Sequence, residues 1–258
     1  MAFQLMLYQI SVYCISDIGL IRQNNEDFWK LLKNEQFFVL ADGMGGHQAG
    51  EVASKKAVEH LCHLVQQQGD LFRKEMVLAE QSLKEMIQEV NAIIYRLGRE
   101  HPYLRGMGTT LCCIFLHAEG LVYAHVGDSR IYRLRHGKLE QLTQDHSLLR
   151  ELIDLGQLSE QQAEDFLYKN IITKAIGTEP TVEPAVTHTS LETGDILLMC
   201  TDGLSDLVGC EDMQEIISQH SEKEAAQLLV KKAKQKGGYD NITLILVKVQ
   251  DKHAPYLS

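Results

Sequence analysis

The stretch FFVLADGMGGHQAGEVAS, residues 37–54, runs from an apolar segment through Asp42 and Gly43 into a segment with helical spacing. An apolar run that ends in Asp-Gly is typical of a buried strand with a carboxylate at its end. The stretch ILLMCTDG, residues 196–203, repeats this pattern with Asp202 before a glycine. Each glycine allows a turn or a close approach of the backbone to a ligand. Either pattern alone also fits an ordinary turn, because Asp and Gly are common turn residues.

Other apolar runs of strand length occur at the start, in the middle and at the end of the chain, over residues 7–15, 111–116, 121–126, 131–134 and 242–249. Apolar residues that recur every three or four positions predict amphipathic helices over 49–65 and 76–97, and a third helical block covers 211–236. Clustered strands with helices in separate blocks predict an α+β fold rather than alternating βαβ units.

The composition narrows the class of protein. The chain has 258 residues, 45% of them apolar, and a net charge of −10, which disfavours binding to nucleic acid. No apolar run approaches the roughly 20 residues that cross a bilayer, and the amino terminus lacks the basic start of a secretory signal. Six cysteines without metal-ligand spacing favour a reducing cytoplasm. We therefore expect one cytoplasmic, monomeric domain over residues 1–258, with no nucleic-acid partner and no membrane span.

Seven acids lie next to strand ends or glycine turns: Glu26, Asp27, Asp42, Asp128, Asp202, Asp206 and Asp240. If four of them converged, their repulsion in a partly desolvated cleft would raise their pKa values unless cations compensated. Oxygen ligands without Cys or clustered His suit Mg²⁺ or Mn²⁺. Two such ions about 3.5–4 Å apart share a water, lower its pKa and hold the oxygens of a displacement at phosphorus. Arg22, whose planar fork matches phosphate oxygens, is the candidate cation for a phosphate substrate.

Eight motifs together resemble one known family, the metal-dependent Ser/Thr protein phosphatases of the protein phosphatase 2C type, in its bacterial branch. A single such motif is weak, but the ordered set is specific and runs nearly end to end. The motifs are RQNNED (22–27), LADGMGGHQAGEVAS (40–54), MGTT (107–110), VGDSR (126–130), LTQDHSLL (142–149), NIITKAIG (170–177), CTDGLSD (200–206) and DNIT (240–243).

The resemblance implies an αββα four-layer sandwich, in which two mostly antiparallel sheets face each other and helices cover both outer faces. It implies a single catalytic domain with a flap over about residues 143–177. By motif position, Asp42 would bridge two metal ions, and the Gly43 carbonyl would join one of them. Asp202 and Asp240 would bind the other ion.

The remaining site residues take their roles from the same resemblance. Glu26 and Asp27 would act through metal-bound waters, and Asp128 and Asp206 match positions that hold a third, weaker ion in bacterial relatives. Arg22 matches the phosphate-binding arginine.

The implied mechanism is direct attack on phosphorus by the bridging water, without a phosphoenzyme. The animal branch has a His where this chain has Met44, so the acid that protonates the leaving group is open between His47 and a metal-bound water. We prefer the water.

The expected function is hydrolysis of phosphoserine and phosphothreonine in proteins, with Mn²⁺ or Mg²⁺ as cofactor. Substrates of bacterial Ser/Thr kinases, and the kinases themselves, are the expected partners. The alternative is a non-catalytic module that binds phosphoprotein on the same fold. A third reading is a related hydrolase that acts on a stress-response regulator or a small phosphate ester. The filled ligand positions disfavour the non-catalytic module, whereas the sequence does not separate the other two.

Overall fold

Two antiparallel β-sheets form the centre of the protein in the computed structural model, which describes residues 8–45, 49–68, 74–159, 162, 166, 168 and 171–250. The first sheet contains, in spatial order, β1 (Gln9–Asp17), β11 (Ile242–Gln250), β10 (Ile196–Cys200), β7 (Arg130–Arg135) and β8 (Lys138–Gln141). The second contains β2 (Asp27–Leu32), β3 (Phe37–Met44), β5 (Leu111–His117), β6 (Gly120–Val126) and β9 (Ala185–Thr189), and the short β4 (Gly108–Thr109) pairs with β3.

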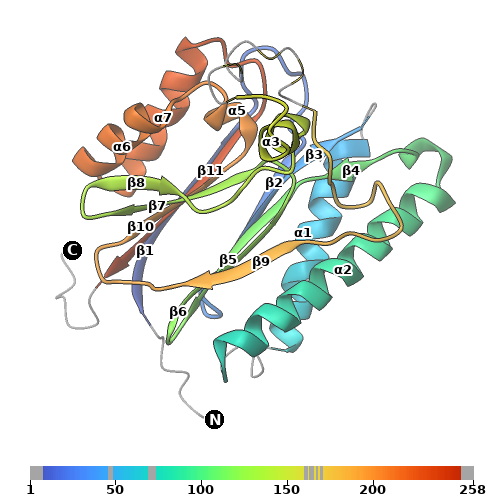
Figure 1. Cartoon of the computed structure of the whole chain (residues 1–258), viewed down its shortest axis with the longest axis horizontal. Coiled ribbons are helices and arrows are strands. Elements are labelled where there is room, and N and C mark those ends of the chain that lie inside the picture. The colour runs from blue at the N-terminus through green and yellow to red at the C-terminus, as the bar shows by residue number, and fades with distance from the viewer. Residues whose placement is uncertain are drawn as a thin grey trace.

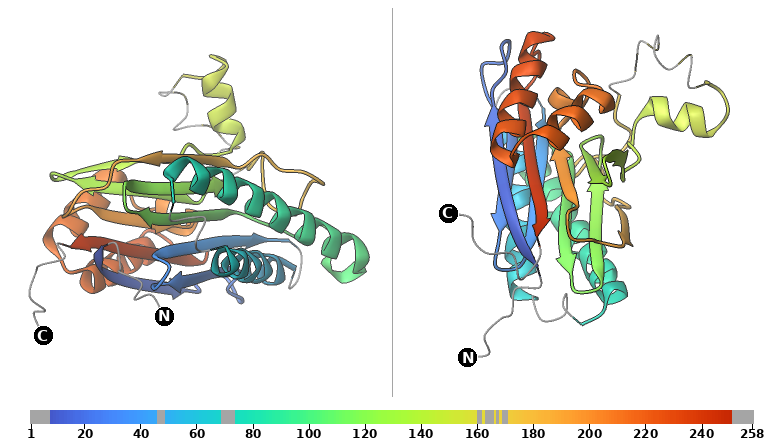
Figure 2. Two further views of the ribbon diagram at one scale, coloured as in Figure 1. Left: turned by 90° about the horizontal axis from the view of Figure 1, so that it is seen from below. Right: turned by 90° about the vertical axis from the view of Figure 1, so that its left-hand side faces the viewer.

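Helices cover the outer faces of both sheets (Figure 1). The long helices α1 (Ala49–Gln67) and α2 (Met76–Glu100) pack on the second sheet, and a 3₁₀ turn, η1 (Pro102–Leu104), follows them. Two C-terminal helices, α6 (Cys210–Gln219) and α7 (Glu222–Gln235), pack on the first sheet beside the short α5 (Asp202–Ser205). Helix α3 (Leu148–Asp154) stands away from the sheets (Figure 2).

The alternation of side chains along the strands builds three separate apolar layers. Phe38 and Leu40 of β3 point between the two sheets, where they join Leu197 and Ile245 from the first sheet. Phe37 and its alternate neighbours on β3 face α1 and α2 instead. A third cluster lies between the first sheet and α6 and α7. Each central strand is therefore buried on both faces, and the expected αββα sandwich is confirmed.

Several boundaries differ from the sequence prediction. Strands β2, β8 and β9 were not predicted, because all three lie at sheet edges and carry polar residues in place of a continuous apolar run. The helical block over 211–236 is two helices, divided where Ser221 caps α7 in a reciprocal capping box with Glu224. Helix α3 lies within the 143–177 segment, and several later residues of that segment are outside the described ranges.

No helix in the described ranges is long and apolar enough to cross a bilayer.

Candidate metal centre

A pocket of about 330 Å³ opens at one edge of the sandwich, where β3, α5 and the turn between β6 and β7 meet. All the predicted site residues except Asp27 and Asp206 line it. The lining residues are Arg22, Glu26, Asp42, Gly43, Met44, Gly45, Thr110, Asp128, Ile172, Asp202 and Asp240. Folding thus brings together acids that lie up to about 200 positions apart in the chain.

The two other predicted acids lie directly beside this pocket. Asp27 is buried behind it on β2, opposite Asp42 in the register with β3, and accepts a hydrogen bond from Thr201 Oγ1 at 3.1 Å. Asp206 is exposed and lines an adjoining hollow that also includes Asp202 and Asp240.

The position of Asp42 is fixed by its backbone. Its N–H donates to Thr110 Oγ1 at 2.9 Å, and its carbonyl oxygen accepts from the Thr110 N–H at 2.8 Å and from Thr109 Oγ1 at 2.7 Å. Two β-strands and a buried threonine pair therefore hold this acid on the pocket wall.

Both Asp-Gly glycines are required for close packing rather than for a turn. Strand β3 continues through Gly43 to Met44, so the chain does not turn at this glycine. A Cβ on Gly43 would clash with the carbonyl of Gly50 on α1, and a Cβ on Gly203 would clash with the carbonyl of Asn241. Neither glycine has a positive φ. The missing side chain lets α1 and the start of β11 approach the acids.

Burial raises the pKa of four acids that line the pocket and of Asp27 behind it, and neighbouring carboxylates add to the effect. The pKa of Asp27 rises to about 7 and that of Asp128 to about 7. The pKa of Asp202 rises to about 6, whereas that of Asp42 lies well above its usual range. Burial also raises the pKa of Glu26. The pocket therefore carries an excess of negative charge that is unfavourable at neutral pH unless cations bind.

The donor set fits hard divalent ions. The buried Oδ1 atoms of Asp202 and Asp27 have no hydrogen-bond partner within the described part of the chain, although buried carboxylate oxygens are normally paired. Among the described residues, no group of three or more His, Cys, Asp or Glu side chains is arranged so that it could hold a metal ion by itself. Mg²⁺ and Mn²⁺ do not need such a group, because Mg²⁺ binds through one or two carboxylates and keeps several waters. Together with waters, these residues can hold such ions.

Arg22 lies at the mouth of the pocket and is half exposed. Its Nη2 donates to Asp240 Oδ2 at 2.7 Å. Burial lowers the pKa of the guanidinium, but the hydrogen bond to Asp240 and the charge of Asp240 raise it by more, so the net pKa is raised. Arg22 is therefore charged at every pH at which the acids ionise.

Asn241 organises this side of the pocket and was not predicted from the sequence. Its Nδ2 donates to the carbonyls of Ile18 and Asn24 at 3.0 and 2.9 Å, and its Oδ1 accepts from the Glu26 N–H at 2.8 Å. The buried amide thus joins the loop that carries Arg22 to the strand that follows Asp240. Its position next to Asp240 in the DNIT motif was the available signal, but its partners lie more than 200 positions away.

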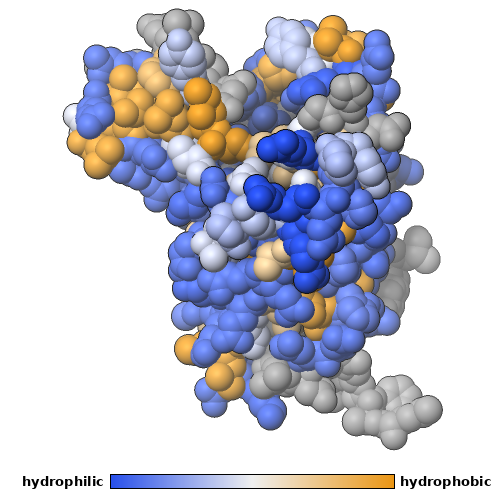
Figure 3. Space-filling view, turned by 90° about the vertical axis from the view of Figure 1, so that its right-hand side faces the viewer, coloured by the Kyte–Doolittle hydropathy of each residue, from blue (hydrophilic) through white to orange (hydrophobic). Residues whose placement is uncertain are grey.

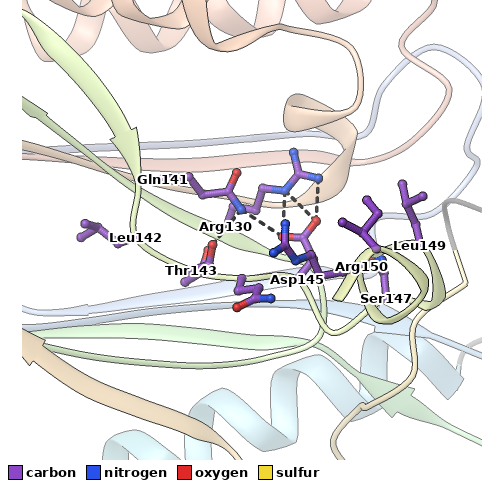
Figure 4. Close-up of a pocket in the computed structure, with 10 residues that line it drawn as sticks. Arg130, Gln141, Leu142, Thr143, Asp145, Ser147, Leu149 and Arg150 are labelled. Carbon is purple, nitrogen blue, oxygen red and sulfur yellow. Dashed lines mark hydrogen bonds and ion pairs between the residues drawn. The ribbon is translucent and has the colours of Figure 1, made fainter. Parts of the chain in front are cut away.

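A partly buried ion pair joins the base of the 143–177 segment to the chain just after Asp128 (Figure 4). Arg130, two residues after Asp128, donates from Nε and Nη2 to the Asp145 carboxylate at 2.6–3.0 Å. Gln141 Nε2 also donates to Asp145, at 3.2 Å. These groups line a second cavity of about 530 Å³ together with residues of α3. His47, the candidate acid, lies outside the described residues.

Comparisons with known proteins agree with this geometry. A family model described as protein phosphatase 2C matches residues 19–235. The serine/threonine phosphatase stp of Listeria welshimeri is 40% identical over 237 residues, which cover 90% of this chain and 93% of the relative. The protein phosphatase PhpP of Streptococcus pneumoniae is 36% identical over 250 residues, which cover 95% of this chain and 100% of the relative.

Solved structures give the same result. The catalytic domain of the serine/threonine protein phosphatase PstP, in complex with two manganese ions, superposes with a TM-score of 0.81 at 36% identity. The match covers 94% of this chain and 99% of that one. With the fold, the acidic pocket and the family match in agreement, the chain belongs to the protein phosphatase 2C family and is a bacterial-type, metal-dependent Ser/Thr protein phosphatase.

Proposed function

We propose that the pocket hydrolyses phosphoserine and phosphothreonine esters of proteins with two Mn²⁺ or Mg²⁺ ions bound by its acids. The observation that supports this most is Asp202 Oδ1, a buried carboxylate oxygen in a pocket of repelling acids that has no hydrogen-bond partner among the described residues. A divalent ion supplies the missing partner and the missing positive charge together. Two bound manganese ions in the related PstP structure support the same cofactor class.

In this proposal the acids have different roles in metal binding. Asp42 would contribute to the binding of both ions, the Gly43 carbonyl to that of one of them, and Asp202 and Asp240 would hold the other. Glu26 and Asp27 contribute through water; the latter lies behind Asp42, which suits an indirect role.

Asp128 and Asp206 are the proposed ligands of a third, weaker ion. The charge of Asp206 contributes to the raised pKa of Asp128, and the exposure of Asp206 to solvent suits weak binding.

Bound ions would activate a water for attack on phosphorus and stabilise the charge that develops on the phosphate oxygens. The chain's own residues then position the substrate. Arg22 turns its fork from Asp240 toward two phosphate oxygens, which a lysine could not hold in the same way. Asn241 keeps the Arg22 loop in place while this happens.

Replacing Arg22 with Ala is expected to lower kcat/KM for an aryl phosphate about 10- to 100-fold, because a charge-assisted bidentate contact is lost. Most of the loss should appear in KM at saturating Mn²⁺. Arg22→Lys should recover part of it, since the charge remains but the fork does not. Steady-state kinetics test this, with Arg96→Ala on α2 as the control, an exposed arginine that does not line the pocket. Equal kinetics for Arg22→Ala and the wild type would remove Arg22 from the site.

We propose that residues 1–258 form one catalytic unit in which residues 143–177 act as a flap beside the pocket. The Arg130–Asp145 pair supports this, because it connects the base of that segment to the turn that carries Asp128. Ile172 of the same segment lines the pocket.

The proposed partners are phosphorylated substrates of bacterial Ser/Thr kinases and the kinases themselves, and the proposed state is a cytoplasmic monomer. The cytoplasmic location rests on the six cysteines, which are all free thiols.

The function is tested by phosphate release from phosphoserine and phosphothreonine peptides with Mn²⁺, with Mg²⁺ and with EDTA. We expect turnover with the metal ions and none with EDTA. Peptide binding without phosphate release would favour the non-catalytic module. Turnover of small phosphate esters alone would favour a hydrolase with another substrate.

A further inference from the structure

Exposed apolar side chains lie on the loop that carries Arg22 and directly before Asp240, and both of these residues line the pocket. Ile18, Leu20, Ile21 and Tyr239 are 40%, 58%, 66% and 61% exposed, and we call these four residues the loop patch. A water-exposed group of large apolar side chains is a common mark of a binding surface.

Most of the other exposed large apolar residues lie in one further segment of the chain. Within the described residues, three of them belong to the 143–177 segment: Leu155, Tyr168 and Ile171. Only Val77 and Tyr103, both near the ends of α2, lie elsewhere. On the face seen in Figure 3, two hydrophobic areas lie at the top of the molecule with a hollow between them.

The backbone of the loop patch is held firmly. The Leu20 N–H donates to the Gly238 carbonyl at 2.8 Å, and Asn241 donates to the Ile18 carbonyl at 3.0 Å. Gly19 has a φ of +81°, and a Cβ there would clash with the carbonyl of Asp240. The apolar side chains therefore project from a fixed framework, which reduces the entropy that a partner must remove on binding.

The loop patch is continuous with the proposed phosphate-binding residues. Ile21 directly precedes Arg22, and Tyr239 directly precedes Asp240. A phosphoserine whose phosphate binds Arg22 has its neighbouring residues close to this loop. An extended peptide advances about 3.3 Å per residue, so one to three residues beside the phosphoserine lie within reach of the patch.

We propose that the loop patch binds a large apolar side chain of the phosphoprotein substrate, within about three residues of the phosphorylated Ser or Thr. This inference rests on the proposed function and adds a substrate preference to it. Leu20 and Ile21 are the contacts to test, because they are more exposed than Ile18 and, unlike Tyr239, do not directly precede a proposed metal ligand. None of the patch residues is a proposed metal ligand or phosphate-binding residue, so the patch selects the substrate without taking part in phosphate hydrolysis.

The test compares Leu20→Ser and Ile21→Ser with the wild type on three substrates in Mn²⁺. One phosphopeptide carries Leu residues around the phosphoserine, a second carries Ser residues there, and the third substrate is an aryl phosphate. Each variant should lose about tenfold in kcat/KM on the Leu peptide, which corresponds to about 1.4 kcal/mol. Activity on the other two substrates should stay within about twofold. Val77→Ser is the matched control, because Val77 is 63% exposed but distant from the patch in the fold.

Two results would overturn the inference. An equal loss on all three substrates would mean that the loop only supports Arg22, and unchanged activity on the Leu peptide would mean that the patch binds nothing. Failure of the wild type to release phosphate from either peptide, with the aryl phosphate still hydrolysed, would instead overturn the proposed protein substrate. The aryl phosphate therefore separates failure of the inference from failure of the function.

Discussion

Asp202→Asn is expected to reduce Mn²⁺-dependent turnover by at least about a thousandfold, which is equivalent to about 4 kcal/mol of transition-state stabilisation. The substitution keeps the shape of a side chain whose buried Oδ1 has no partner among the described residues, but removes the charge that would hold a cation. The measurement is phosphate release at saturating Mn²⁺. Asp212→Asn is the matched control, because the Asp212 carboxylate pairs with Lys232 and Lys236 on the surface and should not affect turnover.

The same substitution should have the opposite effect on stability. Burial and the charge of Asp206 raise the pKa of Asp202 to about 6, so its ionised form is unfavourable in the metal-free protein at neutral pH. Metal-free Asp202→Asn should therefore melt at or above the wild-type temperature. Inactivity with a clearly lower Tm would point to a damaged fold, and retained activity would remove Asp202 from the proposed metal site.

The stability gained from Mn²⁺ is expected to grow strongly between pH 5 and pH 8. Asp27 and Asp128 have a pKa of about 7 in the folded protein and ordinary values near 3.8 when unfolded. The folded state therefore binds more protons than the unfolded state in this window. The contribution of these two acids to the stability of the metal-free protein is complete below about pH 3.8 and is lost as the pH rises through 7. Mn²⁺ prefers the ionised carboxylates, so its effect increases over the same range.

Two histidines oppose this trend in the metal-free protein. Burial lowers the pKa of His146 to about 4 and also lowers that of His125. The stability that these histidines contribute to the folded protein therefore increases as the pH rises toward 6.5. It is common to both forms of the protein and cancels in the difference between metal-loaded and metal-free Tm.

Thermal melts with Mn²⁺ and with EDTA measure that difference. At 100 times Kd a ligand adds about 2.7 kcal/mol, which corresponds to a Tm increase of about 5–10 °C for a chain of this size. We expect such an increase at pH 8 and almost none at pH 5. A Tm increase independent of pH would contradict binding to these carboxylates, and Asp202→Asn should reduce the increase.

Local sequence patterns were sufficient for the central elements of the fold. β3, β5, β6, β10 and β11 are buried on both faces, so each appears as an apolar run. Edge strands such as β8 and β9 lack that signal, because one face or edge meets water and accepts polar residues. The break between α6 and α7 had a local signal, Ser221 with Glu224, which the prediction did not use.

The site followed a similar division. The acids could be identified because Asp-Gly after an apolar run is a local pattern, and because the ordered motifs resemble one family. The roles of Asn241 and Thr110 could not be identified in this way, since a hydrogen bond across 68 or 217 positions leaves no periodic trace in the sequence. The sequence also did not indicate that Gly43 and Gly203 allow other backbone segments to pack closely against them, because the packing is decided by the tertiary structure.

The sequence by itself therefore determined the α+β class, the family and the set of acids, because burial and turn chemistry act on neighbouring residues. Only the tertiary structure decided that five of these acids line one pocket, and that buried oxygens of Asp27 and Asp202 have no partner in the described part of the chain. It also showed that the apolar side chains beside Arg22 are exposed. Charge repulsion, desolvation and surface continuity depend on distances in space, and the packing of the two sheets sets those distances.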